Sequence, residues 1–247
     1  MSLYAIGDLH LHFGSVLKAT HQRTDPLWKH HEQKFRLQCM RLLQPQDTLV
    51  LCGDHSWGRN LSEAEPDLEY IATLPGRKIL LRGNHDMFWD SSKTQMLNER
   101  YQGRLFFLQN SFLPYGEYAI TGTKGFTFEG PFYLDQHRRI IGWDQDAEAH
   151  AQKIIRREAE RLRISLDAAQ KAGYTKKIMF LHYPPTCILE HESIFTRLAE
   201  AYSVEKVFYA HCHGAARFHD SIEGTLHGIE YQLISGDYLK WQPWKIF

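Results

Sequence analysis

Short apolar runs in the first third of the chain each lead to a glycine and a polar side chain. The runs lie at 4–6, 48–52 and 78–81, and the polar residues that follow them are Asp8, Asp54 and Asn84. Runs of this length, bounded by glycine, are typical of buried β-strands. We therefore expect three strand ends that each present a polar group.

Helical patterns separate these three strands. Asp25 can cap a helix that has Pro26 in its first turn. The apolar residues that follow at helical spacing are Trp28, Phe35, Cys39 and Leu42. A second helix is expected at 61–74, where a Pro-Gly pair ends the pattern. Alternation of strand and helix predicts a parallel sheet covered by helices, with functional groups at the carboxyl ends of its strands.

The pattern changes in the rest of the chain. Aromatic residues and glycines at 105–143 predict hairpins and long loops. The longest helical pattern covers 146–172 and is closed by Gly173. Further strands are expected at 177–181, 206–210 and 231–234. Nothing marks a linker or an internal repeat, so we predict a single domain over residues 1–247.

Composition narrows the class of protein. A chain of 247 residues with 43% hydrophobic content can bury one large core. Lys plus Arg and Asp plus Glu both total 29, so the net charge disfavours nonspecific binding to nucleic acid or anionic membranes without excluding a local basic patch. No apolar run approaches the roughly 20 residues that cross a bilayer, and the first strand begins too early for a signal peptide.

The cysteine pattern adds an expected location. The four cysteines are far apart and form no C-x-x-C pair, which is typical of a reduced intracellular protein. We therefore expect a cytoplasmic protein. The sequence carries no signal for an oligomeric state.

Candidate chemistry gathers in five short segments. They are G-D-L-H at 7–10, G-D-H-S-W-G at 53–58, G-N-H-D at 83–86, L-H-Y-P-P at 181–185 and A-H-C-H-G at 210–214. One Asp or His after a strand is more often a cap, but five such segments in one chain are hard to explain that way. Carboxylate, amide and imidazole groups suit Mn, Fe or Zn. Asp-x-His and His-x-His place both side chains on one side of an extended segment.

The order of these segments resembles the calcineurin-like metallophosphoesterase family. Its pattern is D-x-H, then G-D, then G-N-H-D/E, then a lone His, then G-H-x-H, and the resemblance covers residues 7–214. The resemblance implies an α/β fold, a sandwich of two mixed β-sheets packed face to face and flanked by helices in four layers.

The resemblance also implies roles for individual residues. One metal ion would take Asp8, His10 and His213, the second would take Asn84, His182 and His211, and Asp54 would bridge the two. His85 matches the histidine that protonates the leaving group without touching metal. Asp86 is the nearest candidate in sequence to orient His85, and we include it as a catalytic residue.

The implied reaction is metal-dependent hydrolysis of a phosphomonoester or phosphodiester. A hydroxide that bridges two divalent ions, most simply Mn with Fe or Zn as alternatives, would attack phosphorus. Two cations about 3.5 to 4 Å apart can both clamp the phosphoryl oxygens and activate a water. A protonated His85 would supply the leaving oxygen with a proton.

Departures from the family pattern bear on the substrate. Protein serine/threonine phosphatases have Asp and Arg where this chain has Trp57 and Gly58, so we expect a small-molecule or nucleotide phosphoester as substrate. Arg59 and Arg82 could bind phosphate or form structural ion pairs. Ala210 replaces a family glycine, which should fit if its φ is negative.

Two other functions stay open. A nuclease or a cyclic-nucleotide phosphodiesterase would use the same site, although the neutral net charge weakens the nuclease. A non-catalytic metal-binding scaffold is the alternative from another class. The complete ligand set and the non-ligand His85 argue against a scaffold.

Several neighbours of the motifs are expected to have packing or supporting roles. His12 and His55 should make hydrogen bonds around the ligands. Trp57, Phe88 and Trp89 could equally wall the pocket or belong to the core. Cys212 should point away from the metal ions.

Overall fold

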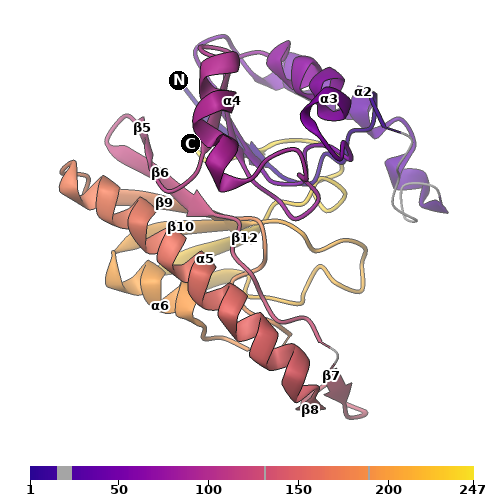
Figure 1. The fold of residues 1–247 in the computed structure, drawn as a ribbon, viewed down its shortest axis with the longest axis vertical. Helices are drawn as coiled ribbons and strands as arrows, with labels where there is room; N and C mark the ends of the chain where they lie inside the picture. The colour runs from indigo at the N-terminus through magenta and orange to yellow at the C-terminus, as the bar shows by residue number, and fades with distance from the viewer. Residues whose placement is uncertain (16–23, 131, 189) are drawn as a thin grey trace.

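Two β-sheets lie between two layers of helices in the computed structural model, which describes residues 1–15, 24–130, 132–188 and 190–247 (Figure 1). The first sheet has the order β13-β1-β2-β3-β4. Its strands are β1 (Leu3–Ile6), β2 (Thr48–Cys52), β3 (Arg77–Leu81), β4 (Leu105–Leu108) and β13 (Trp244–Lys245). The strands β1 to β4 run parallel, as the alternation of strand and helix predicted, and β13 joins β1 antiparallel.

The second sheet is also mixed and has the order β11-β12-β10-β9-β6-β5. Its strands are β5 (Leu113–Tyr115), β6 (Tyr118–Thr123), β9 (Lys176–Leu181), β10 (Val204–Tyr209), β11 (Gly224–Leu226) and β12 (Ile229–Leu233). The four central strands are parallel, whereas the edge strands β5 and β11 are antiparallel to their neighbours. A separate antiparallel hairpin consists of β7 (Phe132–Leu134) and β8 (Ile140–Trp143).

Helices cover the outer face of each sheet. On the first sheet lie α2 (His31–Leu42), α3 (Leu61–Ala72) and α4 (Thr94–Arg100), with the short 3-10 turns η1 (Pro26–Trp28) and η2 (Ser91–Lys93) beside them. On the second sheet lie α5 (Gln145–Lys171) and α6 (Ile194–Ala201), on the opposite side of the molecule in Figure 1.

The inner core joins the two sheets face to face. Val50 and Ile79 of the first sheet and Phe180 and Phe208 of the second belong to one buried cluster. The order helices, sheet, sheet, helices confirms the four-layer α/β sandwich that the resemblance implied. No helix among the described residues is both long enough and apolar enough to span a bilayer.

The long helix α5 illustrates how sequence sets local structure. The Asp144 side chain accepts a hydrogen bond from the Ala147 N–H and so caps the first turn. The buried residues Ala159, Leu162, Leu166 and Ala169 recur at intervals of three and four. This apolar stripe packs on the second sheet.

The helix that we expected to start at Asp25 is split in two. Asp25 does cap a turn, because its carboxylate accepts a hydrogen bond from the Leu27 N–H, but only η1 follows. His30 then adopts a left-handed conformation with a φ of 54°, which an α-helix cannot propagate through, so α2 begins at His31.

The region 105–143 is more regular than its glycine-rich sequence predicted. It forms the expected hairpins β5–β6 and β7–β8, but β4 and β6 also enter the two sheets as parallel strands. Sequence periodicity does not show this because partners such as β9 lie more than fifty residues away in the chain.

Candidate metal centre

The carboxyl ends of strands from both sheets meet at one edge of the sandwich. The backbone N–H of Gly7, after β1, donates to the carbonyl oxygen of Ile234, after β12, at 2.7 Å. Two groups of side chains that could hold a metal ion lie at this edge. They are Asp8, His10 and His213 in one group and Asp54, His182 and His211 in the other.

The first group is the set that the resemblance assigned to one ion. His10 Nε2 lies 3.2 Å from His213 Nε2, and His213 Nε2 lies 3.8 Å from Asp8 Oδ2. Asp8 and His10 come from the segment after β1, whereas His213 follows β10. The group therefore draws on both sheets.

The second group also combines the two sheets. His182 follows β9, and its Nε2 lies 3.3 Å from His211 Nδ1. Asn84 follows β3, and its Oδ1 lies 2.7 Å from the same His182 Nε2. The structure thus brings Asn84 to the position that the resemblance gave it.

Asp54 belongs to the second group and also lies close to the first. Its Oδ2 is 3.6 Å from His10 Nε2 in the first group and 3.4 Å from His182 Nε2 in the second. A single carboxylate in this position can reach an ion in either group. The geometry therefore matches the bridging role implied by the resemblance.

Hydrogen bonds fix which nitrogen of two histidines faces the cluster. His182 Nδ1 lies 3.0 Å from the carbonyl oxygen of Cys52, and His213 Nδ1 lies 3.1 Å from Asp237 Oδ1. Both oxygens accept, so each Nδ1 carries a proton, and Nε2 is the nitrogen of each ring that would bind a metal ion.

Sequence reasoning missed Asp237. It follows Gly236 after the β12 strand, so it repeats the Gly-Asp pattern that we used for the first two strands. Its buried carboxylate holds His213 and also accepts the Gly214 N–H at 3.0 Å. The pattern alone could have identified it.

Glu129 was also missed, and no sequence signal marks it. It lies in the loop after β6, with its carboxylate 3.2 Å from His211 Nε2. Because His211 turns Nε2 toward Glu129, its Nδ1 faces the cluster. The same carboxylate accepts a hydrogen bond from Arg217 at 2.6 Å.

The backbone at the site is left-handed rather than extended. Asp8, His10, Asp54 and His211 have φ values of 60°, 44°, 52° and 71°. The assumption that extended segments bring the paired ligands together is therefore wrong, although the ligands do converge. Such conformations cost energy in non-glycine residues and gather at functional sites.

Two glycines make room for the ligands. A Cβ on Gly83 would lie 2.1 Å from Asp54 Oδ1, and a Cβ on Gly53 would lie 2.4 Å from His182 Nδ1. Gly53 also has a φ of 86°. Side chains at these positions would displace the groups that face the cluster.

His85 lies beside both groups without belonging to either. Its backbone N–H donates to Asp54 Oδ1 at 2.8 Å. Its ring lies 4.2 Å from the Trp57 ring and 5.5 Å from the His10 ring, measured between centroids. Trp57 is thus a wall of the site and packs against the predicted general acid.

Asp86 has a structural position between two loops of the site. Its fully buried carboxylate accepts hydrogen bonds from backbone N–H groups of both neighbouring loops. The donors are Asp54, His55, Ser56 and Gly83, at 3.0, 2.8, 3.3 and 2.7 Å. These bonds hold the loop of Asp54 against the loop of Asn84, and they satisfy the carboxylate with backbone donors.

Replacing Asp86 with alanine should therefore reduce stability as well as activity. We expect a loss of about 3 to 5 kcal/mol in the free energy of unfolding, because buried N–H groups lose their acceptor. Urea unfolding of the metal-free protein measures it, with the exposed Asp146→Ala as a control that changes stability by about 0.5 kcal/mol or less. If Asp86→Ala is as stable as the unaltered protein but has lost its activity, Asp86 has a catalytic role.

The remaining neighbours have mostly supporting roles. His55 Nε2 lies 2.7 Å from the Leu81 carbonyl oxygen, and the His12 ring stacks over His31. Phe88 and Trp89 are core residues of the first sheet.

Two residues of the last motif fit as expected. Cys212 packs into the outer core of the second sheet and so points away from the cluster. Ala210 does not have a positive φ, so a glycine is not needed at this position.

Burial and neighbouring charges shift the pKa values of the cluster. Asp8 and Asp54 are both buried, and burial raises the pKa of Asp8. Burial acts the same way on Asp54, but His182, His10 and His85 together outweigh it and hold the pKa of Asp54 well below its usual value. Burial lowers the pKa of His182, whereas Asp54 and Asp8 raise it to about 9.

The donor set fits divalent metal ions. Asp8 Oδ1 is buried and has no hydrogen-bond partner within the described ranges of the chain. The other oxygen, Oδ2, accepts the His211 backbone N–H at 2.8 Å. A buried carboxylate oxygen without such a partner is costly unless a cation neutralises it. Imidazole nitrogens and carboxylate oxygens together suit Mn, Fe or Zn.

The family comparison agrees with this picture. The family model described as calcineurin-like phosphoesterase matches residues 1–215. No curated protein matches the chain. Among solved structures, a protein of unknown function, AQ665 from Aquifex aeolicus, is 16% identical, with 99% of this chain and 95% of that chain covered and a TM-score of 0.43. The protein TT1561 of Thermus thermophilus is 11% identical, with 85% and 81% covered and a TM-score of 0.50, which shows a shared fold alone.

Proposed function

The chain belongs to the calcineurin-like phosphoesterase family, and on that premise we propose that it hydrolyses a small phosphomonoester or phosphodiester with His85 as general acid. The observation that carries the proposal is the position of Asp54, in the second group of ligands and close to the first. A site for two adjacent ions is the arrangement that phosphoryl transfer needs.

Seven side chains would bind the two metal ions. Asp8, His10 and His213 would hold one ion, Asn84, His182 and His211 would hold the other, and Asp54 would touch both. When bound, two divalent cations supply positive charge to the phosphoryl oxygens and lower the pKa of a water. We propose Mn as the native metal, with Fe or Zn as alternatives.

His85 would hold a proton at its ring and deliver it to the leaving oxygen. Its backbone is fixed by Asp54 and its ring by Trp57, so its position depends on the same loops that carry the ligands. General acid catalysis of this kind contributes typically 10² to 10⁴ in rate.

Small phosphoesters should be better substrates than phosphoserine peptides. Trp57 fills the position where protein phosphatases have an aspartate and packs on His85 and His10. We expect kcat/KM of Mn-loaded protein for p-nitrophenyl phosphate or bis-p-nitrophenyl phosphate to exceed that for a phosphoserine peptide by roughly tenfold. A chelator should abolish both activities. Faster hydrolysis of the peptide would contradict the proposed substrate class.

A cytoplasmic location is part of the proposal. All four cysteines are free, namely Cys39, Cys52, Cys187 and Cys212. Free, mostly buried thiols support a reducing compartment.

A further inference from the structure

Arg59, one of the two arginines suggested by the sequence, does not supply a guanidinium to the site. Arg59 has a side chain that is 64% exposed, and it pairs with Glu63 at 2.8 Å. Gly58 stands where protein phosphatases have an arginine, and a Cβ there would lie 2.5 Å from the Ala64 backbone nitrogen. The backbone therefore leaves no room for any side chain at position 58.

Arg217 instead lines the pocket at the metal centre. The pocket is formed by this arginine together with His10, Asp54, Trp57, His85, Glu129, His211 and His213. Arg217 follows the last ligand motif by three residues and belongs to the loop between β10 and β11. Its side chain is 38% exposed, so a ligand in the pocket can reach it.

Two carboxylates fix the orientation of Arg217. Its Nη2 donates to Glu129 Oε1 at 2.6 Å, and its Nε donates to Asp220 Oδ2 at 3.1 Å. A guanidinium has five N–H donors, so three remain for a ligand. Because Glu129 also contacts His211, it holds the guanidinium beside a metal ligand.

Arg217 also borders a second cavity. This cavity has a volume of about 310 Å³, and Arg217 and Glu129 line both it and the metal pocket. Its other walls include Leu134, Pro184 and Arg138. The volume is at the lower end of the range for small-molecule sites.

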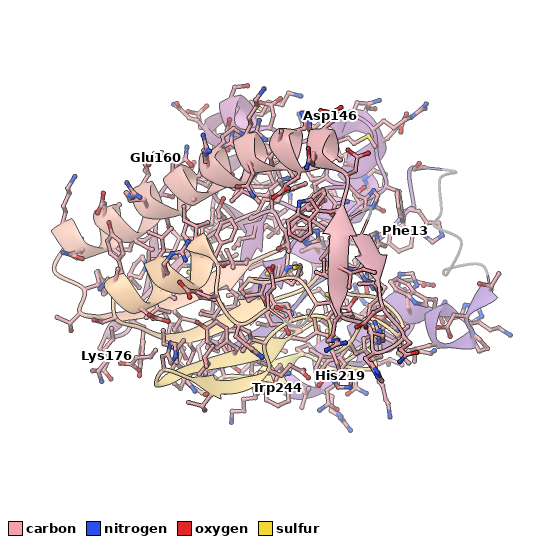
Figure 2. The ribbon with its side chains drawn as sticks, turned by 90° about the horizontal axis from the view of Figure 1, so that it is seen from below. Phe13, Asp146, Glu160, Lys176, His219 and Trp244 are labelled. Atoms are coloured by element: carbon pink, nitrogen blue, oxygen red, sulfur yellow. The ribbon has the colours of Figure 1, made fainter. Side chains whose placement is uncertain are left out.

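The β7–β8 hairpin forms one side of this second cavity. Arg138, in the turn of the hairpin, lies 3.5 Å from Asp220, which also pairs with Arg217. Figure 2 shows the hairpin descending from the start of α5 toward the segment with His219, next to Asp220. The hairpin is therefore connected to the metal pocket through Asp220 and Arg217.

We propose that Arg217 binds a phosphoryl oxygen of the substrate and that the second cavity receives the organic group of the ester. Guanidinium forks match phosphate geometry and charge. Apolar Leu134 and Pro184 suit an organic group, and Arg138 suits a polar or anionic substituent on it. The substrate class would be esters with a small organic group that carries a polar or anionic substituent. This inference rests on the proposed function and specifies its substrate.

Phosphate binding tests Arg217 without turnover. We expect Arg217→Ala in the Mn-loaded protein to weaken inorganic phosphate binding, measured by calorimetry, by about 10- to 100-fold, since a hydrogen bond from a charged donor is lost. Arg217→Lys should lie in between, because it keeps the charge and loses the fork. Arg59→Ala is the matched control and should bind phosphate like the unaltered protein.

Metal content, measured on the same samples, separates binding from structure. Both Arg217 variants should keep the metal content of the unaltered protein. Loss of metal from Arg217→Ala would make Arg217 a structural residue and overturn the proposal. Unchanged phosphate affinity in both variants would overturn it as well.

Ester selectivity tests the second cavity. Leu134→Trp should lower the ratio of kcat/KM for the p-nitrophenyl ester of thymidine 5′-phosphate to kcat/KM for p-nitrophenyl phosphate by about tenfold. Ile141→Trp, on the same hairpin but outside the cavity lining, should leave the ratio unchanged. An unchanged ratio in Leu134→Trp would refute the assignment of this cavity.

The same experiments distinguish an error in the proposed function from an error in the substrate assignment. If the unaltered Mn-loaded protein hydrolyses no ester, the proposed function is wrong, and phosphate calorimetry still decides the role of Arg217. If it hydrolyses esters while Arg217→Ala binds phosphate normally, only the further inference is wrong.

Discussion

Replacing His85 with asparagine is expected to lower kcat for an ester with a poor leaving group by roughly 10² to 10⁴. Metal content and fold should persist, because the ring of His85 belongs to neither ligand group and its backbone N–H to Asp54 remains. Asparagine fills part of the space against Trp57 but cannot donate a titratable proton to the leaving oxygen.

A series of esters with leaving groups of graded pKa measures the effect. The loss should shrink for nitrophenyl esters, because a leaving group that is stable as an anion has little need of a proton. His182→Asn is the comparison, since it should lower metal content and slow every ester alike. Equal losses across the series would refute the general-acid role, and metal loss in His85→Asn would make His85 a ligand.

Asp54→Ala should have the largest effect on the metal ions themselves. Protein purified without chelator and reconstituted should hold about two equivalents per chain, and the variant should lose both. The reason is that Asp54 Oδ2 lies within 3.6 Å of a histidine nitrogen in each group. Without the cations, hydrolysis should fall by roughly 10³ or more, since such ions supply several kcal/mol of transition-state stabilisation.

Elemental analysis decides this prediction, with Asp8→Ala as the matched variant. Asp8 belongs to one group, so its loss should chiefly weaken one site. A reproducible content near zero in the reconstituted unaltered protein would contradict the two-metal site. Loss of a single equivalent in Asp54→Ala would contradict the bridging position.

The strand and helix pattern predicted a parallel sheet and the ligand candidates that follow its strands, whereas the sandwich of two sheets was predicted from the resemblance alone. A strand end places its next residue within narrow limits, so Asp8, Asp54 and His182 could be assigned to one edge before their distances were known. This prediction was possible because the carboxyl ends of parallel strands meet at one edge of a sheet. The prediction of Asn84 beside His182 rested on the resemblance alone, and the 2.7 Å contact agrees with it.

The residues around the ligands could not be predicted in the same way. Glu129 and Arg217 come from loops whose paths depend on packing between segments 88 residues apart. The structural role of Asp86 was not predicted, because its carboxylate accepts backbone hydrogen bonds from a loop about thirty residues away in the chain. Left-handed φ values at four ligands also leave no periodic trace in the sequence.

Neither sheet carries a complete ligand set, since each group combines residues that follow β1, β2 or β3 with residues that follow β9 or β10. The first sheet is built mostly from the first half of the chain, and the second is finished by strands near the C-terminus. During folding, an ion therefore has no full coordination shell on a half-formed molecule. A bound ion would stabilise the docked pair of sheets and neither sheet alone.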